Sequence, residues 1–517
     1  MDLHYENEEL TYVGNALVEE NCFRNMPIEQ TRLPRFDEIV DELPAPIWDG
    51  HDRHLACYRK AWELAFGNLR APKVGSGFVS PFIDTAFNGC IFMWDSSFML
   101  MFGKYADRIF KFQQTLDNFY SHQHRDGFIC REIDEETGGG RFSRMDPSST
   151  GPNTMVWCEW EYYRNFGDKQ RLEKVFPPLM AFHRWMKTNL TWPDGTYYST
   201  GWGCGMDNLP RLQQGVHVSF QHGHMVWVDT CMQERMNCGI LIDMCRELGR
   251  EEFIPELEQE RALLETVINQ KLWDEESGFY YDLWRNGEHN KVLHIGAYWS
   301  LLAKCAPENR ARRLIAHLDD EFCTDVMVPT LAKTHEAYKP YGGYWCGAVW
   351  APTNYMLLKG LDAYGECDRA HAIGKNYLDA VVDVFSETDT LFENYSSCRK
   401  DGKAIKGDPA KADFVGWTGI APIAVLFEYV FGIKPNAADN TITWHINLTE
   451  RHGVERYPFG SDGELTLICE ARDDADASPV ITVKSNIPVT LNVVWGECEC
   501  KQQMTYHIDK NKTETSK

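Results

Sequence analysis

The chain has 517 residues and a formal net charge of −24, with 76 acidic and 52 basic side chains. Its length allows two or three average domains, or one large toroid with an accessory domain. The acidic balance argues against a nucleic-acid partner or an anionic membrane surface and fits a protein that handles a neutral or small ligand. No apolar run reaches the length of about 18 residues that a membrane-spanning helix needs.

The cysteines and the N-terminal sequence indicate a reducing compartment. Seventeen cysteines are scattered without the spacing of a disulfide framework or of a zinc site. The N-terminal "MDLHYENEEL" lacks the basic and apolar segments of a secretory signal. We therefore expect a cytoplasmic protein without metal or cofactor, although a processed secreted form would share these features. The sequence indicates no oligomeric state.

Helical patterns follow one another along most of the chain. Residues 1–48 are acidic and lack sustained periodicity, so we interpret them as an arm packed on the main body. Helix–turn–helix patterns then occupy 54–70 with 95–123, 154–190, 224–274, 295–318 and 349–387, and the second helix of 154–190 is expected to break at Pro177 and Pro178. About six pairs, spaced by roughly 50 to 70 residues, predict a mainly α (α/α)6 toroid over 49–434.

The sequence pattern changes from helical to strand-like after about residue 435. Segments such as "NTITWHINL", "GELTLICEA" and "VTLNVVW" are short, β-branched and alternating, with turn residues between them. They predict a small C-terminal antiparallel β-domain over 435–510, followed by a disordered tail over 511–517.

Aromatic residues are unusually prominent, with 17 Trp, 22 Tyr and 27 Phe. Many of the tryptophans adjoin Gly, Asp or Asn. Sugar rings present C–H faces that stack on aromatic rings and hydroxyls that bind carboxylates and amides, so this composition suggests a carbohydrate ligand. A large core also requires aromatic residues, so composition alone does not decide the matter.

Three acids lie in glycine- or aromatic-rich settings, where a catalytic carboxyl is expected. Asp207 lies in "GWGCGMDNLPR", whose glycines would let a sugar ring approach the backbone, and Glu393 lies in "TLFENYSS". Cleavage of a glycosidic bond needs two such carboxyls, one on each side of the bond. Asp95 in "FMWDSSF" is a third candidate, although Asp before Ser is also a common helix N-cap. Glu159, Glu161 and Asp229 lie within helices and are expected to be core or rim hydrogen-bonding groups.

Four motifs, in order, carry a family resemblance that spans about residues 80–432. They are "FMWDSSF", "GCGMDNLP", "GGYWCGAVWAPTNYMLLKGL" and "ENYSSCRKDGK…DFVGWTGIAP". Their content and spacing resemble glycoside hydrolase family 63 and its relatives, the group that contains processing α-glucosidase I and bacterial mannosylglycerate hydrolase. The last two motifs are fairly specific, whereas "WD" alone is weak.

The resemblance implies an inverting, exo-acting hydrolase of an α-linked glucose or mannose in a small glycoside or oligosaccharide. It assigns the general acid to Asp207 and the general base to Glu393. The implied sugar-binding residues are Trp94, Asp95, Asn208, Tyr344, Trp345, Gly347, Trp350, Tyr395 and Trp417. Inversion needs carboxyls roughly 6.5–9.5 Å apart, with the acid kept protonated although a free Asp has a pKa of about 3.9.

Two departures from the family pattern concern the leaving group. Cys346 replaces a common arginine in the "YW-G" motif, and "SSCRKDG" after Glu393 replaces an early Pro and Gly. Both changes lie where the leaving group would sit, so they leave its identity open.

Other functions remain open from the sequence. A glycoside phosphorylase would need donors for phosphate near Glu393, where Arg399 and Lys400 are available. A sugar isomerase or epimerase on the same fold would use histidines such as His222 or His224. The spacing of His217, His222 and His224 matches no metal site, and Arg141 and Arg144 are candidates for the mouth of the site. A catalytically inactive sugar-binding protein is disfavoured because both carboxylates are present.

Overall fold

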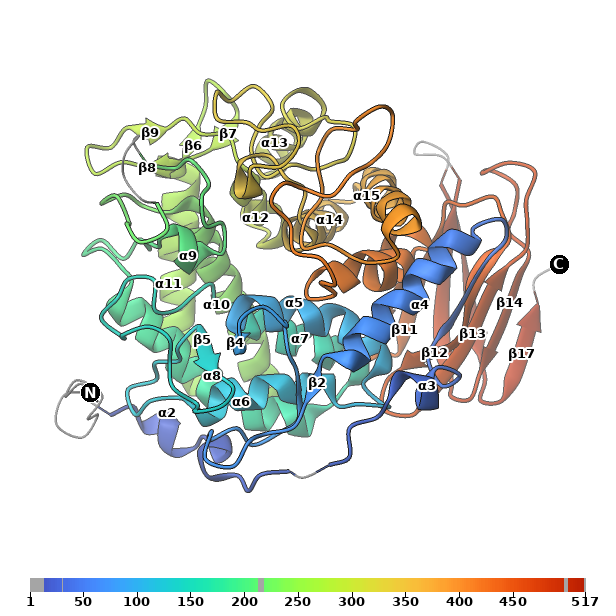
Figure 1. Cartoon of the computed structure of the whole chain (residues 1–517), viewed down its shortest axis with the longest axis horizontal. Helices are drawn as coiled ribbons and strands as arrows, with labels where there is room; N and C mark the ends of the chain where they lie inside the picture. Colours follow the sequence, from blue (N-terminus) through green and yellow to red (C-terminus); the bar gives the residue numbers. More distant parts are fainter. Residues whose placement is uncertain (1–13, 30, 213–217, 497–500, 516–517) are drawn as a thin grey trace.

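The computed structural model describes residues 14–29, 31–212, 218–496 and 501–515. It is mainly helical with a C-terminal sheet region, as predicted (Figure 1). The principal helices are α4 (Asp52–Gly67), α5 (Met93–Gly103), α7 (Met155–Phe166), α8 (Lys169–Asn189), α10 (Val228–Leu248), α11 (Ile254–Val267), α12 (Trp299–Leu302), α13 (Glu308–Asp320), α14 (Ala351–Ala363) and α15 (Cys367–Thr388). Shorter helices are α2 (Ala16–Glu19), α3 (Phe36–Ile39), α6 (Asp117–Ser121), α9 (Gly201–Cys204), η9 (Thr418–Ile420) and the π-helical η10 (Ala421–Val430). Within the described ranges no helix is long and apolar enough to cross a membrane.

Seven of these helices, with η9 and η10 continuous in the chain, contact one another in sequence. α5 packs on α7, α7 on α10, α10 on α12 and α12 on α14, and η9 and η10 pack on both α14 and α5. A second set lies against these helices: α8 contacts α7 and α10, α11 contacts α10, and α15 contacts α14 and η10. We call the first set the inner helices and the second the outer helices.

The sequences of the helices explain this division. Every residue of α5, "MWDSSFMLMFG", is buried, which suits a helix covered on all sides. In the outer helix α11, "IPELEQERALLETV", only Leu257, Glu260, Leu264 and Val267 are buried. These four positions follow the helical repeat, so one stripe faces the core and the charged face meets solvent.

The predicted break in the second helix of 154–190 is wrong, because α8 continues through Pro177 and Pro178. A proline removes one N–H and so frees the carbonyl four residues earlier. Here those carbonyls belong to Glu173 and Lys174, which are exposed, so water can satisfy them. Burial of both prolines and their neighbours on the inner face maintains the helix.

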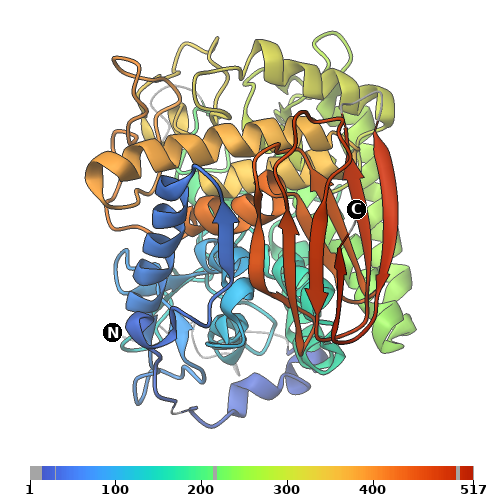
Figure 2. The same ribbon diagram turned by 90° about the vertical axis from the view of Figure 1, so that its right-hand side faces the viewer.

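Two sheets make up the C-terminal region, and Figure 2 shows their strands. One has the order β1-β12-β13-β14-β17 and the other β10-β11-β15-β16. Their strands are β1 (Ala45–Trp48), β10 (Ile433–Asn436), β11 (Thr441–Ile446), β12 (His452–Phe459), β13 (Gly463–Cys469), β14 (Ile481–Ser485), β15 (Val489–Trp495), β16 (Gln502–Ile508) and β17 (Lys512–Thr515).

Three details of the predicted β-domain need correction. The sheets are not wholly antiparallel, because β11 and β15 pair in parallel. The N-terminal arm is part of this region, since β1 pairs antiparallel with β12. The predicted tail is ordered over Lys512–Thr515, where β17 pairs with β14 and satisfies the backbone groups of that edge.

Four short two-stranded sheets lie between the helices. They pair β2 (Leu69–Arg70) with β3 (Phe82–Ile83), β4 (Cys90–Phe92) with β5 (Glu132–Asp134), β6 (Trp273–Asp274) with β7 (Phe279–Tyr280), and β8 (Asp282–Leu283) with β9 (His289–Asn290). In the second sheet, whose strands are separated in the chain by α5 and α6, Phe92 lies opposite Glu132, which brings Glu132 beside the start of α5.

Candidate active site

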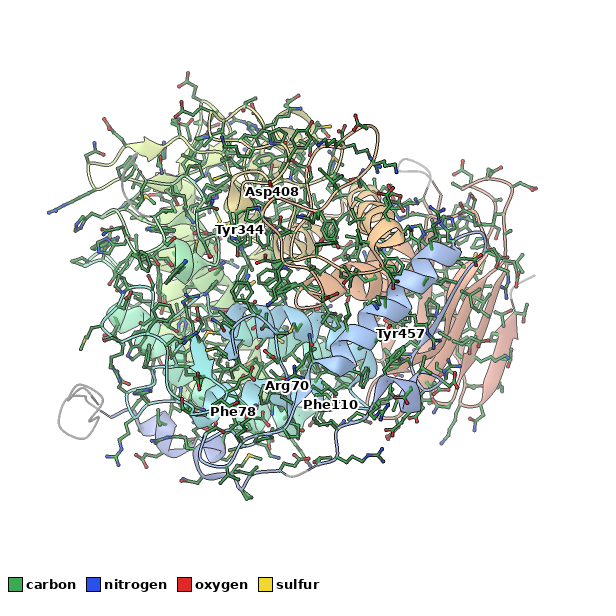
Figure 3. The ribbon with its side chains drawn as sticks, viewed as in Figure 1. Arg70, Phe78, Phe110, Tyr344, Asp408 and Tyr457 are labelled. Atoms are coloured by element: carbon green, nitrogen blue, oxygen red, sulfur yellow. The ribbon has the colours of Figure 1, made fainter. Side chains whose placement is uncertain are left out.

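A cavity of about 440 Å³ lies where the inner helices begin. Seven of the predicted site residues line it, namely Trp94, Asp95, Asp207, Tyr344, Trp345, Glu393 and Trp417. They come from the first turn of α5 and from the segments that precede α10, α14 and η9. Tyr344 is labelled in Figure 3, where it lies in the central part of the helical region. The fold therefore gathers residues that are far apart in the sequence.

Asp207 lies on a tight loop after α9. Gly205 ends this helix with φ +78°, a conformation that favours glycine, and a Cβ there would lie 3.1 Å from the Trp94 ring. A Cβ on Gly201 would lie 2.4 Å from the Asp207 carbonyl oxygen. The Ser219 hydroxyl donates to that carbonyl at 2.8 Å. Small residues are thus required by the loop's own packing as well as by its place at the cavity.

The Asp207 carboxyl has a strongly perturbed acidity. Burial raises its pKa to about 7, the Arg131 guanidinium opposes this rise, and the negative charges of Glu393 and Glu132 reinforce it. A carboxyl with this pKa retains its proton over much of the neutral range. It can therefore donate a proton to a leaving oxygen.

Glu393 is held by donors that favour its ionised form. The Tyr344 hydroxyl donates to Oε1 at 2.9 Å and the Lys411 backbone N–H donates to Oε2 at 3.2 Å. Trp417 Nε1–H donates to the Glu393 carbonyl at 2.7 Å, which fixes the backbone. Burial raises the pKa of Glu393, and these bonds together with the Lys411 charge oppose the rise. The carboxylate is therefore oriented and can accept a proton.

Asp95 is not a helix N-cap. It is the third residue of α5, and Phe92 occupies the N-cap position. Burial raises the pKa of Asp95 well above its usual range, and a backbone N–H offsets this only in part. A buried carboxyl that lines a polar cavity at a helix start is suited to bind hydroxyl groups.

Four predicted sugar-binding residues are not among those that line the cavity: Asn208, Gly347, Trp350 and Tyr395. Asn208 Oδ1 accepts from the Trp345 N–H at 2.9 Å and its Nδ2–H donates to the Gly343 carbonyl at 3.1 Å, so it joins the loop of Asp207 to the segment of Tyr344 and Trp345. Trp350 stacks on Trp345 with centroids 3.8 Å apart. Asn208 and Trp350 therefore position Trp345.

The backbone around Gly347 and the Tyr395 hydroxyl complete this support. Gly347 has φ +150°, and a Cβ there would lie 2.4 Å from the Lys339 carbonyl oxygen. The Tyr395 hydroxyl accepts from the Phe392 N–H at 3.2 Å, on the strand-like segment that carries Glu393.

Several lining residues were not predicted as site residues: Phe87, Asn88, Phe92, Met93, Arg131, Glu132, Phe142, Gly151, Trp202 and Gly205. Arg131 Nη2 lies 2.7 Å from Glu132 Oε1, and the pairing of β5 with β4 places both at the cavity. Arg141, expected at the mouth, lines the cavity. Arg144 does not, because it is buried in an ion pair with Asp126.

The histidines near Asp207 in sequence do not enter the described lining of the cavity. His222 and His224 pack against Trp192, with centroids 5.3 and 6.0 Å away. His217 lies outside the described residues.

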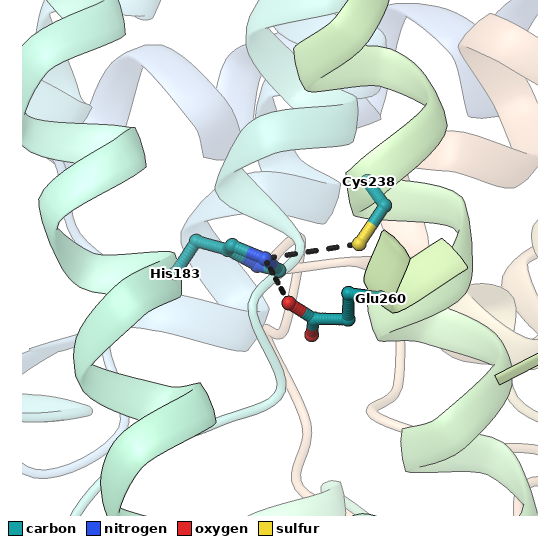
Figure 4. A group of neighbouring side chains, drawn as sticks. All are labelled: His183, Cys238 and Glu260. Carbon is teal, nitrogen blue, oxygen red and sulfur yellow. Dashed lines mark hydrogen bonds and ion pairs between the residues drawn. The ribbon is translucent and has the colours of Figure 1, made fainter. Parts of the chain in front are cut away.

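One group of potential metal ligands occurs in the described ranges, formed by His183, Cys238 and Glu260 (Figure 4). His183 Nδ1 lies 3.0 Å from Glu234 Oε2, and its Nε2 lies 3.3 Å from Glu260 Oε2. Burial alone would lower the pKa of His183, but the carboxylates raise it well above its usual range. These contacts describe a buried ion network between α8, α10 and α11, away from the cavity.

Comparison with known proteins places this cavity in a family context. The profile of the mannosylglycerate hydrolase MGH1-like glycoside hydrolase domain matches residues 91–403. Mannosylglycerate hydrolase of Rubrobacter radiotolerans is 28% identical over 201 residues, covering 36% of this chain and 40% of that protein. Alpha-glucosidase 2 of Arabidopsis thaliana is 21% identical over 424 residues, covering 65% of this chain and 52% of that protein. The chain thus spans about half or less of these relatives.

A solved structure shows the same fold. The GH63 mannosylglycerate hydrolase of Thermus thermophilus, in complex with glucose, superposes with a TM-score of 0.56 at 20% identity. The match covers 71% of this chain and 99% of that chain. Asp95, Asp207, Tyr344 and Glu393 all lie within the range 91–403 that the family profile matches.

Proposed function

Because the chain belongs to the mannosylglycerate hydrolase MGH1-like glycoside hydrolase family, and so is a GH63-like glycoside hydrolase, we propose that it is an inverting, exo-acting enzyme that removes an α-linked glucose or mannose. The observation that carries this proposal is the pair of carboxyls in one cavity. Asp207 is half-buried with its pKa raised to about 7, and Glu393 is oriented by Tyr344 and Lys411.

The fold that would carry this activity is an (α/α)6 toroid. Support comes from the order of helix contacts, in which each inner helix packs on the next and η9 and η10 return to α5. The outer helices α8, α11 and α15 alternate with inner helices along the chain. Such a ring would bring the start of α5, the segments before α14 and η9 and the loop of Asp207 to one cavity, where the proposed site lies.

The proposed reaction is a single displacement. Glu393 takes a proton from water, the water oxygen attacks the anomeric carbon, and Asp207 gives its proton to the departing oxygen. The reaction then leaves Glu393 protonated and Asp207 ionised, and exchange with solvent restores both. Asp95 would bind sugar hydroxyls, and the Trp94, Trp345 and Trp417 rings would face the sugar's C–H surfaces.

The cavity volume and the relatives support a small sugar at the non-reducing end. A cavity of about 440 Å³ admits few rings, which suits exo cleavage. The relatives include a mannosylglycerate hydrolase and an alpha-glucosidase, so glucose and mannose are the sugars to test first.

The decisive experiment is an NMR time course with a panel of α-glucosides and α-mannosides. We expect release of the non-reducing sugar as its β-anomer before mutarotation. First appearance of the α-anomer would contradict inversion. Cleavage that requires added phosphate would instead indicate a phosphorylase, whose expected donors Arg399 and Lys400 do not line the cavity.

We place this activity in a reducing, cytoplasmic compartment. The supporting observation is that all fifteen cysteines in the described ranges are free thiols.

A further inference from the structure

The acid side of the cavity carries an aromatic patch, which we define as Phe142, Trp202 and Phe220. Phe142 and Trp202 meet edge to face with centroids 5.6 Å apart, and Trp202 and Phe220 do so at 4.3 Å. Phe142 and Trp202 line the cavity, and Phe220 is 41% exposed. The patch therefore runs from the cavity lining out to the surface.

Hydrogen bonds link this patch to the loop of the proposed general acid, Asp207. Trp202 belongs to α9, on the same loop as Asp207. The Trp202 backbone N–H donates to the Ser219 backbone carbonyl at 3.2 Å, and the Ser219 hydroxyl donates to the Asp207 backbone carbonyl at 2.8 Å. Phe220 follows Ser219 directly, so one residue joins the aromatic rings to the acid. A group bonded to the oxygen that Asp207 protonates would lie beside these rings.

The cation nearest to this patch already has partners. Arg131 pairs with Glu132 at 2.7 Å, and its Nε–H donates to the Ser148 carbonyl at 2.9 Å. Its guanidinium lies 4.5 Å from the centroid of the Phe142 ring and 5.5 Å from that of Trp202. Arg131 thus orders the patch and has its charge balanced by Glu132. Arg141, the other arginine of the lining, lies close enough to Glu132 for its charge to oppose the rise in the pKa of that carboxyl, so Glu132 counters this cation too.

We propose that the aromatic patch is the leaving-group subsite and that it takes a neutral sugar ring, not a small carboxylate such as glycerate. This inference rests on the proposed glycosidase function. Aromatic faces favour the C–H surface of a pyranose, and the balanced charges give no net attraction for an anion.

The test compares three kinds of substrate with the wild-type enzyme and with Trp202→Ala. α-Glycosyl fluorides of glucose and mannose carry a leaving group too small to reach the patch, and fluoride departs without a proton from Asp207. α-Linked disaccharides of the same sugars fill the subsite with a neutral ring. The α-glycosides of glycerate fill it with an anion.

We expect the wild-type kcat/KM to be at least tenfold higher for a disaccharide than for a glycerate glycoside. Trp202→Ala should lower the ratio of disaccharide to fluoride kcat/KM by about tenfold, and Trp202→Phe should restore most of it. The control is Trp160→Ala, which removes a partly exposed tryptophan of α7 that stacks on Tyr163, away from this cavity. It should not change the ratio.

Two other outcomes would contradict the proposed subsite. A higher kcat/KM for glycerate glycosides than for disaccharides would contradict a neutral leaving group. If Trp202→Ala lowered kcat/KM equally for the fluoride and the disaccharide, Trp202 would have only a structural role. If the wild-type enzyme hydrolyses neither fluoride, or does so independently of Glu393, the proposed glycosidase function fails instead. The two failures are therefore distinguishable.

Discussion

Two cavities lie toward opposite ends of the same inner helices. The candidate site, of about 440 Å³, is lined by residues from the helix starts. The second cavity, of about 420 Å³, is lined by residues from the later turns or just beyond the ends, among them Lys104 after α5, Arg164 in α7, Lys359 in α14 and Glu428 in η10. Helix ends with exposed carbonyls favour cations, which agrees with the lysines and arginines gathered there.

The carboxyls of the two cavities have pKa values shifted in opposite directions. In the second cavity burial would raise the pKa of Glu428, but Lys104 and Lys359, at 2.7 and 2.9 Å, hold it at about 2. In the candidate site burial raises the pKa of Asp207 to about 7, because Arg131 only partly opposes it. The difference lies in the cations: two lysines pair directly with Glu428, whereas Arg131 acts on Asp207 only through its charge.

The largest expected effect is loss of turnover in the candidate site. Glu393→Gln removes the group that would take the proton from water, and Asp207→Asn removes the proton donor. We expect each to lower kcat on an α-linked disaccharide by about 10²–10⁴-fold. Steady-state kinetics and circular dichroism will check activity and folding. Either variant retaining a tenth of wild-type activity would remove that residue from the mechanism.

Removing a charged partner from the second cavity should lower the free energy of unfolding and leave turnover intact. Lys104→Met deletes the 2.7 Å partner of Glu428, and both side chains are almost fully buried. We expect a loss of about 3 kcal/mol, because one partner of a buried pair is left incompletely compensated. Urea unfolding followed by tryptophan fluorescence measures this loss. An unchanged unfolding midpoint, or a large loss of kcat in the folded variant, would contradict the contrast between the cavities.

The raised pKa of Asp207 predicts that its ionised form lowers the free energy of unfolding at neutral pH. Its folded-state pKa of about 7 exceeds the unfolded value of about 3.9, so the protonated form favours folding at low pH and this contribution is lost as pH rises through 7. Asp207→Asn should match wild type near pH 4 and be more stable by roughly 1–3 kcal/mol at pH 8. Thermal unfolding at both pH values measures the difference. A stabilisation that does not grow with pH would contradict the raised pKa.

The smallest expected effect is a shift in the pH profile. Activity should fall as pH rises through about 7, when Asp207 loses its proton. Arg131 lowers the pKa of Asp207, so Arg131→Met should move this basic limb of kcat/KM upward, by about half a unit to one unit. The profile should be measured with an α-linked disaccharide. With a glycosyl fluoride, which needs no acid, the basic limb should weaken or vanish.

Sequence reasoning predicted the helical body, the C-terminal strands and seven of the residues brought into one cavity. Local patterns suffice for these features, since helical periodicity and strand alternation are properties of short windows. The motif settings of Asp207 and Glu393 identified acids outside charged helix faces. Trp202 lay within the motif that contains Asp207, yet its place beside the acid depends on Ser219, which follows it by many residues.

The sequence did not predict the features that depend on pairing between distant segments. The parallel register of β11 with β15 and the pairing of β17 with β14 depend on how distant strands meet. Arg131 and Glu132 reach the cavity because β5 pairs with β4, and nothing in their immediate sequence marks them. Asn208 and Trp350 belong to recognisable motifs but are not among the residues that line the cavity. Their side chains contact Trp345, which does line it.

The pairing of β1 with β12 also bears on the order in which the protein is made. β1 precedes α4 and all the later helices, and β12 follows them. During synthesis from the N-terminus, β1 has no partner strand until β12 has left the ribosome. β1 must therefore stay unpaired while α4 and the later helices are made. Its pairing is then a late folding step that joins the segment before these helices to the segment after them.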